Sequence, residues 1–263
     1  MTTSAPSAIT RPVLHYQGSK WTIAPWVIQH LPEHTTYVEP FGGGAAVLLR
    51  KEPSPVEVYN DLDSGVVGFW RVLRSRPQEL LPLIQATPWA REEYELAWEP
   101  CEDELETARR FFMRCWMSYM GSTDRPSGWR ANARSRQGFI PLWGQEERLL
   151  AVAERMRSVQ FEHDNALAVI RRFDGPETLF YCDPPYMAST RTSGSGYACE
   201  MDEADHLALL DTLRNVKGKV VLSGYPSDLY RGELESRGWR MVSRQSRTRD
   251  PKVRRTECLW IKP

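Results

Sequence analysis

Short β-rich runs alternate with helical patterns through most of this 263-residue chain, and the alternation limits the possible folds more than any other feature. The runs are Thr36–Glu39, Val56–Asn60, Thr178–Asp183, Lys219–Ser223 and Cys258–Ile261. Strands separated by helices form βαβ units, which predict a mainly parallel sheet with helices on its faces. Because the last run follows a Gly-Trp turn, we expect it to be an added edge strand, either parallel or antiparallel.

The clearest helix prediction begins at a candidate cap, Asp202. An aspartate placed before a helix accepts hydrogen bonds from N–H groups of the first turn. Apolar residues then recur at helical spacing, at Leu207, Leu210, Leu213 and Val216. We expect these four residues to form the buried stripe of the helix.

The alternation breaks between residues 87 and 158. Thr87-Pro88 is typical of a helix start, with proline at the first helical position. One helix face then carries Phe111, Phe112, Cys115, Trp116 and Tyr119. A polar, arginine-rich stretch follows at 121–138, and loops of that length are usually functional or disordered. We therefore predict a sheet domain of residues 1–86 and 159–263, with an inserted, mainly helical subdomain at 87–158.

Charge is unevenly spread along a chain with 34 basic and 34 acidic side chains and a formal net charge of zero. That balance excludes a uniformly basic nucleic-acid binder but not a local basic face. Residues 87–107 hold eight acids and one arginine, whereas residues 109–160 hold ten arginines and four acids. Residues 231–255 hold nine basic and three acidic side chains. The two basic segments indicate either a face for an anionic polymer or solvated helix surface.

Cysteine usage and hydropathy narrow the class of protein further. The five cysteines form no CxxC pair and no Cys/His cluster with zinc spacing, which predicts reduced thiols and no metal site. No apolar run approaches the roughly 18 residues of a membrane span. We expect a cytoplasmic protein with no membrane partner.

Polar residues end four of the predicted strands, at Glu39, Asp61, Asp183 and Ser223. Ligands of open parallel sheets bind beyond the carboxyl ends of the strands, so we expect a crevice at this edge. The glycines at 42–44 would let the backbone approach a ligand at the mouth of a helix. A carboxylate of Asp61 or Asp63 can accept hydrogen bonds from ribose hydroxyls. Together these features predict an adenosine-containing cofactor, although a helix cap would also explain the acidic pair.

Asp183-Pro184-Pro185-Tyr186 follows an apolar strand and is the sharpest feature of the chain. Two prolines end the strand and leave a stiff, extended backbone. A carboxylate and a proline carbonyl held there can accept both N–H bonds of an exocyclic amine and make its nitrogen more nucleophilic. An aromatic ring beside them can stack on the base. A proline-ended strand with a buried tyrosine is the alternative.

These motifs, in this order, resemble those of the Dam-type adenine-specific DNA methyltransferases, and in particular the short phage-type members. The segments that carry the resemblance are Tyr16–Lys20, Tyr37–Gly44, Asn60–Asp63, Asp183–Tyr186, Leu222–Tyr225 and Arg255–Trp260. The first motif is usually written with two glycines before the lysine, and Ser19 replaces the second of them here.

The resemblance implies a Rossmann-like methyltransferase fold with residues 87–158 as the target-recognition subdomain. It implies S-adenosylmethionine as cofactor, double-stranded DNA as partner, and transfer of a methyl group to the N6 amine of an adenine flipped out of the duplex. No metal is needed for this chemistry. We expect a monomer or weak dimer, and a separate restriction endonuclease remains open as a partner. GATC is the commonest target in the family, but the recognition loop cannot be interpreted by rule.

The resemblance also assigns site residues. The cofactor would contact Tyr16, Lys20, Glu39, Phe41, Gly42, Gly44, Asp61, Asp164, Asn165 and Asp183. The catalytic residues would be Asp183, Pro184 and Tyr186. The DNA would contact Arg125, Trp129, Arg130, Arg134, Arg136 and Arg191. Trp129 either wedges into the base stack or packs the loop, and Arg191 either touches phosphate or is solvated. Cys182 is expected to be a buried strand residue and not a nucleophile.

Three other functions compete with this one. The first is methylation of RNA or of a protein amide, although relatives of that kind more often carry asparagine at the position of Asp183. The second is a DNA-binding protein that keeps the fold without turnover, which the intact Lys20, Asp61 and Asp183 oppose. The third is an NAD-dependent oxidoreductase, which lacks support because Val47 stands where the dinucleotide motif has glycine or alanine.

Overall fold

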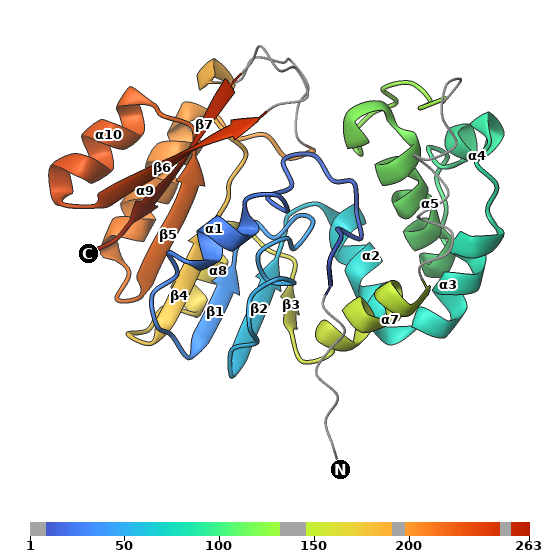
Figure 1. Ribbon diagram of the computed structural model, residues 1–263, viewed down its shortest axis with the longest axis horizontal. Coiled ribbons are helices and arrows are strands. Elements are labelled where there is room, and N and C mark those ends of the chain that lie inside the picture. Colours follow the sequence, from blue (N-terminus) through green and yellow to red (C-terminus); the bar gives the residue numbers. More distant parts are fainter. Residues whose placement is uncertain (1–8, 132–145, 191–197, 248–253) are drawn as a thin grey trace. The chain divides into compact units, whose positions relative to one another are not determined.

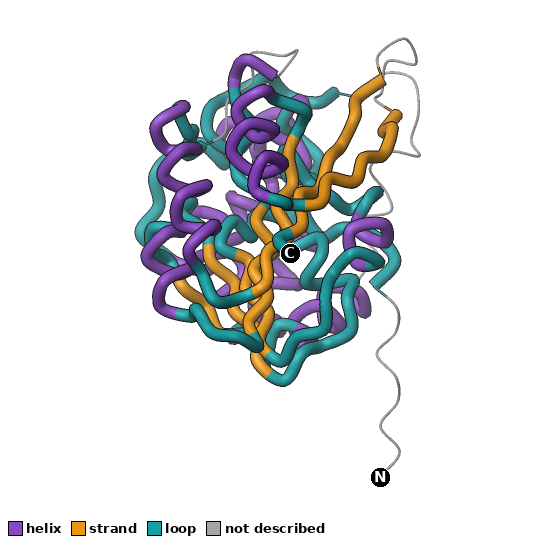
Figure 2. The backbone as a smooth tube through the Cα atoms, turned by 90° about the vertical axis from the view of Figure 1, so that its left-hand side faces the viewer, coloured by secondary structure: helices purple, strands orange, loops and turns teal. Residues whose placement is uncertain are grey.

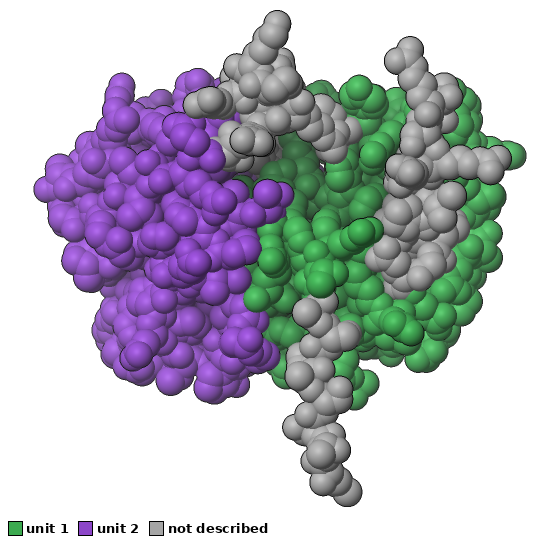
Figure 3. All heavy atoms as spheres, in the orientation of Figure 1, with its two compact units in different colours: residues 1–21, 43–50, 63–159 green, residues 22–42, 51–62, 160–263 purple. Residues whose placement is uncertain are grey.

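The computed structural model describes residues 9–131, 146–190, 198–247 and 254–263. The chain divides into two compact units (Figure 3). The sheet unit comprises Thr22–Gly42, Lys51–Leu62 and Gln160–Pro263, and the helical unit comprises Met1–Trp21, Gly43–Arg50 and Asp63–Val159. The helical unit ends at Val159, one residue after the predicted end of the inserted subdomain. Residues 63–86, however, group with the helices that follow them, so the compact units and the predicted domains divide the chain differently.

The sheet unit contains a seven-stranded sheet with the order β3-β2-β1-β4-β5-β7-β6 (Figure 1). The strands are β1 (Thr36–Glu39), β2 (Val56–Asn60), β3 (Gln160–Glu162), β4 (Thr178–Cys182), β5 (Lys219–Gly224), β6 (Arg240–Arg247) and β7 (Arg254–Ile261). The first five pair in parallel, whereas β7 is antiparallel to both β5 and β6. The predicted mainly parallel α/β fold is confirmed. The last strand, β7, is antiparallel but is not an edge strand, because β6 pairs with its outer side.

Alternation of side chains gives the sheet an apolar face and a face with buried polar groups. The apolar face carries Val38, Phe180 and Leu222 in one core with residues of α8, α9 and α10. These helices span Ala166–Arg172, Glu203–Asn215 and Asp228–Leu234. The remaining short helices of this unit are α1 (Ala24–Ile28), η3 (Ala188–Thr190) and η4 (Glu235–Arg237).

Helix α9 begins as predicted but buries a different stripe. Asp202 and Asp205 form a capping box, in which each side chain accepts a hydrogen bond from the other residue's N–H group. Leu210 and Leu213 are buried as expected, but Leu207 is 41% exposed and His206 is buried in its place. The prediction for Leu207 was wrong because helical spacing places both positions near the edge of the stripe, and only tertiary packing decides between them.

The helical unit comprises α2 (Ser64–Ser75), α3 (Pro77–Ala86), α4 (Arg91–Leu96), α5 (Glu104–Met117), η1 (Tyr119–Gly121) and α7 (Glu146–Arg155). Phe111, Phe112 and Cys115 lie on the buried face of α5, as predicted. Tyr119 is 62% exposed because α5 ends before it. The predicted helix start at Thr87-Pro88 was also wrong, since Thr87 ends α3 and its hydroxyl donates to the Leu83 carbonyl.

Strand β7 extends beyond its neighbour β5 (Figure 2). It pairs with β5 only from Cys258 to Ile261, while its first residues pair with β6 alone.

Among the described residues, no helix is long and apolar enough to cross a membrane.

Candidate active site

The predicted cofactor and catalytic residues of the sheet unit gather where the strand order reverses direction. From β1 the chain passes to β2 and β3 on one side and then returns to β4 on the other. Ligands of open α/β sheets bind at such a point, beyond the carboxyl ends of the strands. Phe41 and Gly42 follow β1, and Asp183–Tyr186 follow β4. Asp61 follows β2 at the same edge, and Asp164 and Asn165 lie just beyond β3.

Asn60, the last residue of β2, ties together the loops after three strands. Its Nδ2 donates to the Pro40 carbonyl at 2.8 Å and to the Asp164 carbonyl at 3.1 Å. Its Oδ1 accepts the Asp164 N–H at 3.0 Å, and its own carbonyl accepts the Gly42 N–H at 2.7 Å. Asn60 therefore fixes the backbone that carries three predicted cofactor residues. The sequence pattern did not single it out, although an amide residue at a buried strand end could have done so.

The glycine-rich turn is shaped by aromatic rings inside each unit. A Cβ on Gly42 would lie 2.2 Å from Cε2 of Tyr59, so no larger residue fits there. In the helical unit, Gly43 has a φ of +46°, and a Cβ on Gly44 would lie 3.3 Å from Cβ of Tyr16. Residues 43–50 form turns and not the expected helix. Packing alone thus accounts for Gly42, and contact of Gly42 or Gly44 with a cofactor stays a prediction.

Asp61 and Asp63 differ in their surroundings. Asp63 caps α2, with its Oδ1 accepting the Gly65 N–H at 2.8 Å and its Oδ2 accepting the Tyr16 hydroxyl at 3.1 Å. The helix-cap explanation of the acidic pair therefore applies to Asp63. It does not account for Asp61, which is half-buried at the end of β2.

Glu39 is a buried carboxylate at the end of β1. It accepts the Tyr37 hydroxyl at 2.6 Å, and burial together with this carboxylate raises the pKa of Tyr37 well above its ordinary value. The bond between neighbours on one sheet face holds the Glu39 side chain at the carboxyl edge.

Asp164 and Asn165 both have structural partners. The carboxylate of Asp164 accepts Arg172 Nη2 at 2.8 Å, and this hydrogen bond lowers the pKa of Asp164. Asn165 caps α8, its Oδ1 accepting the Leu167 N–H at 2.9 Å. Their predicted contact with the cofactor remains a prediction.

The Asp183-Pro184-Pro185-Tyr186 segment leaves the sheet directly after β4. Cys182, the last residue of the strand, is fully buried as predicted. Its burial, and to a smaller extent the charge of Asp183, raises the pKa of its thiol. A neutral thiol in that position is a poor nucleophile. Asp183 is half-buried, with its Oδ1 shielded from solvent. Pro184 is buried. Because the rings of Pro184 and Pro185 fix the backbone, the Asp183 carboxylate precedes a stiff segment.

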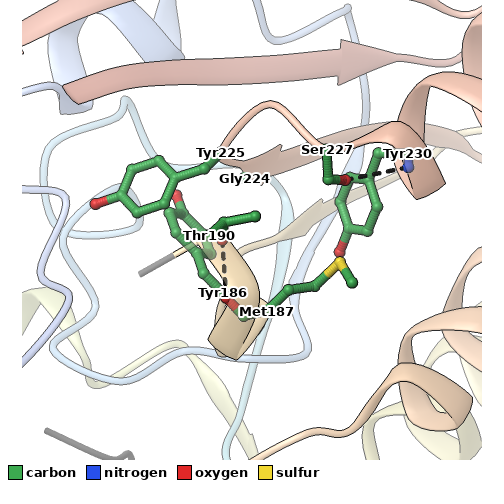
Figure 4. A pocket seen from close by; sticks show the side chains of 7 residues that line it. All are labelled: Tyr186, Met187, Thr190, Gly224, Tyr225, Ser227 and Tyr230. Carbon is green, nitrogen blue, oxygen red and sulfur yellow. Dashed lines mark hydrogen bonds between the residues drawn. The ribbon is translucent and has the colours of Figure 1, made fainter. Parts of the chain in front are cut away.

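Tyr186 is buried and contacts a side chain of β7 and one of the loop after β5. Its hydroxyl donates to Glu257 Oε2 on β7 at 3.0 Å, and its ring meets that of Tyr225 edge-on with centroids 4.5 Å apart. The two rings line a small pocket, which Figure 4 shows from close by. The pocket has a volume of about 10 Å³. The lining residues are Tyr186, Met187, Thr190, Gly224, Tyr225, Ser227 and Tyr230. A larger hollow of about 470 Å³ continues from Met187, Thr190 and Ser227.

A family model of the D12 class N6 adenine-specific DNA methyltransferases matches residues 16–247 of this chain. The chain belongs to this family. This chain is thus an adenine-specific DNA methyltransferase, as the motif order indicated.

The chain is also similar to individual relatives. It is 24% identical to a DNA adenine methylase of Salmonella typhi over 241 residues, covering 84% of this chain and 83% of the relative. It is 26% identical over 246 residues to the Type II methyltransferase M1.LlaDCHI of Lactococcus lactis subsp. cremoris, covering 83% and 82% of the two chains. A structure of a SAM-dependent methyltransferase from Agrobacterium tumefaciens is 15% identical, with a TM-score of 0.40, over 92% of this chain and 59% of that one.

Three of the predicted cofactor residues belong to the helical unit: Tyr16, Lys20 and Gly44. Lys20 is buried and its Nζ donates to the Gly18 carbonyl at 2.8 Å. Tyr16 packs against Phe111 of α5 as well as bonding Asp63. Their approach to the residues of the sheet unit remains a prediction.

The predicted DNA-contacting residues are described only in part, since Arg134, Arg136 and Arg191 lie outside the described residues. The side chain of Arg125 is 64% exposed. Arg130 is half-buried, and its N–H donates to the Met117 carbonyl at 2.7 Å. Trp129 is half-buried, with the guanidinium of Arg91 4.8 Å from its ring centroid. This cover over the ring favours the packing alternative for Trp129.

Part of the basic segment 109–160 is neutralised inside the helical unit. Arg109 is buried and bonds both Glu93 and Glu106, and Arg110 also bonds Glu106. The acidic and basic segments therefore pair with each other, which neither sequence alternative anticipated.

Within the described residues, no group of three or more His, Cys, Asp or Glu side chains could hold a metal ion.

Proposed function

We propose that this enzyme transfers a methyl group from S-adenosylmethionine to the N6 amine of an adenine extruded from double-stranded DNA. The observation that carries this proposal is the position of Asp183-Pro184-Pro185-Tyr186 at the carboxyl end of β4, beside the turn that follows β1. We further propose that the enzyme acts in the cytoplasm on a specific DNA sequence.

The groups at this edge of the sheet fit an adenosine-bearing cofactor. Asp61 offers a carboxylate for the ribose hydroxyls, and Phe41 offers a half-buried ring. Asp183 offers a second carboxylate for the cofactor's amino group, and Asn60 holds the intervening loops in place. S-Adenosylmethionine, when bound, supplies an electrophilic methyl group on a cationic sulfur. Loss of that methyl group leaves a neutral thioether.

The chain's own residues prepare the amine. The carboxylate of Asp183 and the carbonyl of Pro184 accept the two N–H bonds of the exocyclic nitrogen, which withdraws its lone pair from the ring. The proton that this nitrogen later releases passes to the Asp183 carboxylate. Because the prolines fix both acceptors, catalysis rests on positioning and on fixed charge.

An adenine amine is hidden within the duplex, so the base must leave the stack before it can reach Asp183. The face of the Tyr186 ring gives the extruded base a stacking surface. Exposed arginines such as Arg125 would contact phosphates and hold the duplex. Whether the target is GATC, and whether a restriction endonuclease or a second protomer is a partner, are questions for experiment.

The test is a methyl-transfer assay with purified full-length enzyme, labelled S-adenosylmethionine and unmethylated genomic DNA. We expect label in N6-methyladenine within one sequence context, and loss of at least about 100-fold in rate for Asp183→Ala. Asp211→Asn, which removes an exposed carboxylate on α9, is the matched control and should keep full activity.

Three outcomes would contradict the proposal. Label in RNA or protein, with none in DNA, would reassign the substrate. An enzyme that binds the cofactor and DNA without transferring label would be a non-catalytic relative. Wild-type turnover by Asp183→Ala would remove that carboxylate from the mechanism.

A further inference from the structure

The hydroxyl of Tyr186 is bonded to a carboxylate that lies 71 residues further along the chain. Tyr186 Oη donates to Glu257 Oε2 at 3.0 Å, and the two residues are 5% and 9% exposed. A hydrogen bond to a carboxylate is stronger and more directional than one between neutral groups. Burial of a carboxylate is also costly unless hydrogen bonds satisfy it. This pair therefore holds the hydroxyl end of the Tyr186 ring toward β7.

A second contact supports the ring from the side. The rings of Tyr186 and Tyr225 meet at 74° with centroids 4.5 Å apart, which is the preferred edge-to-face geometry. The Tyr225 hydroxyl in turn accepts Arg255 Nη1 at 3.1 Å, and the same guanidinium lies 5.7 Å from the Tyr225 ring centroid. The rotation of the Tyr186 ring is therefore limited both by the bond of its hydroxyl and by its contact with the Tyr225 ring.

The register of β7 explains how one strand reaches both tyrosines. Arg255 and Glu257 are two residues apart and so project from the same face of β7. The last pair between β5 and β7 joins Gly224 to Cys258, and residues before Cys258 continue past the end of β5. Glu257 and Arg255 consequently lie level with the loop that carries Tyr225. The extension of β7 delivers a carboxylate to one ring and a guanidinium to the other.

We propose that Glu257 is a positioning residue for methyl transfer, acting through the Tyr186 hydroxyl, with Tyr225 as the lateral support of the ring. This inference rests on the proposed function, because it assigns Tyr186 to the target base. Because the hydroxyl is bonded to Glu257, we assign the base to a face of the Tyr186 ring, which is 5% exposed and meets the base once the base has displaced its neighbours. Fixing that face fixes the plane in which the adenine lies relative to Asp183 and Pro184.

The inference predicts a specific kinetic and spectroscopic pattern. Glu257→Ala and Tyr186→Phe should each lower kcat by on the order of 10- to 100-fold, because a misplaced reactant loses that much. The KM for S-adenosylmethionine should stay within about twofold of the wild-type value, since neither residue is assigned to the cofactor. Glu257→Gln keeps an acceptor of the same shape and should recover most of the rate.

The spectroscopic readout uses a duplex with 2-aminopurine in place of the target adenine, at the site that the methylation assay identifies. Stacking of the extruded base on Tyr186 should quench its emission in the wild-type complex. Glu257→Ala should relieve this quenching. Glu235→Ala is the matched control, because Glu235 accepts a hydrogen bond from Trp260 of the same strand and should affect neither readout.

A purely structural role for Glu257 would lower the melting temperature but leave kcat and the quenching of the folded enzyme unchanged, and that result would overturn the inference.

If Glu257→Ala does not fold, a double-mutant cycle decides. Glu257→Leu, which keeps the volume of the side chain but removes the acceptor, should cost nothing further in a Tyr186→Phe background, whereas additive losses would show that the two act independently. An active wild-type enzyme with an unaffected Glu257→Ala variant overturns this inference alone. A wild-type enzyme that transfers no methyl group to DNA overturns the proposed function and this inference with it.

Discussion

Two carboxylates two positions apart have different tasks at the end of β2. Asp63 caps α2 and accepts the Tyr16 hydroxyl, so its oxygens serve the fold of the helical unit. Asp61 belongs to the sheet unit, at the carboxyl edge where ligands of such sheets bind. Asp61 is therefore the candidate for the ribose hydroxyls, and Asp63 supplies a control of identical chemistry.

Substitution of each aspartate by alanine should separate these tasks. Asp61→Ala should weaken S-adenosylmethionine binding by about 1.5–3 kcal/mol, the value of hydrogen bonds to a charged group, and should leave stability nearly unchanged. Asp63→Ala should lower the free energy of unfolding by about 1 kcal/mol, as loss of a helix cap does. Calorimetric titration and urea unfolding measure the two effects. An unchanged cofactor affinity in Asp61→Ala would exclude Asp61 from the site.

At the scale of elements, the predictions succeeded where burial shapes the sequence. Strands β1 and β2 were predicted to the residue, because their buried side chains form compact β-rich runs. Strand β3 was missed because its three residues include no fully buried side chain. Strand β6 was missed because it starts with Arg240 and carries exposed polar residues. Edge strands owe their conformation to a partner strand, which a single sequence does not reveal.

The glycines at two elements offer a test of packing against conformational entropy. Gly42→Ala should lower the free energy of unfolding by about 1–3 kcal/mol, because the new Cβ meets the buried ring of Tyr59 at 2.2 Å. Gly68→Ala is the matched control inside α2, where nothing lies within 4 Å of the new Cβ. That control should gain about 0.5–1 kcal/mol, because alanine loses less entropy than glycine on entering a helix. Urea midpoints measure both, and equal effects would refute the packing explanation of Gly42.

At the scale of the whole molecule, the sequence predicted which chemistry gathers at the sheet edge but not the contacts that hold it there. Parallel strands follow from the βαβ pattern and end at one edge of the sheet, so the grouping of Asp61, Asp183 and their loops could be expected. The hydrogen bonds of Asn60 to Asp164 and of Tyr186 to Glu257 span 104 and 71 residues, and no local pattern announces such pairs. The net charge of residues 109–160 also failed to predict these contacts, because Arg109 and Arg110 are paired with an acid from the segment before them.

This internal pairing gives the protein a pH dependence that a solvated basic surface would lack. Hydrogen bonds from Arg109 lower the pKa of Glu106 from 4.5 to about 2. The folded state thus binds the proton less readily than the unfolded chain, so the stabilisation by Glu106 is complete above pH 4.5 and disappears as the pH falls toward 2. Glu106→Gln should cost about 1–2 kcal/mol at pH 7. Its difference from wild type, measured by urea unfolding, should shrink between pH 4.5 and pH 2. Glu104→Gln, at an exposed position in the same helix turn, should track wild type throughout. A difference for Glu106→Gln that stays constant with pH would mean that the arginines do not depend on the charge of Glu106, and that the basic segment is held by packing alone.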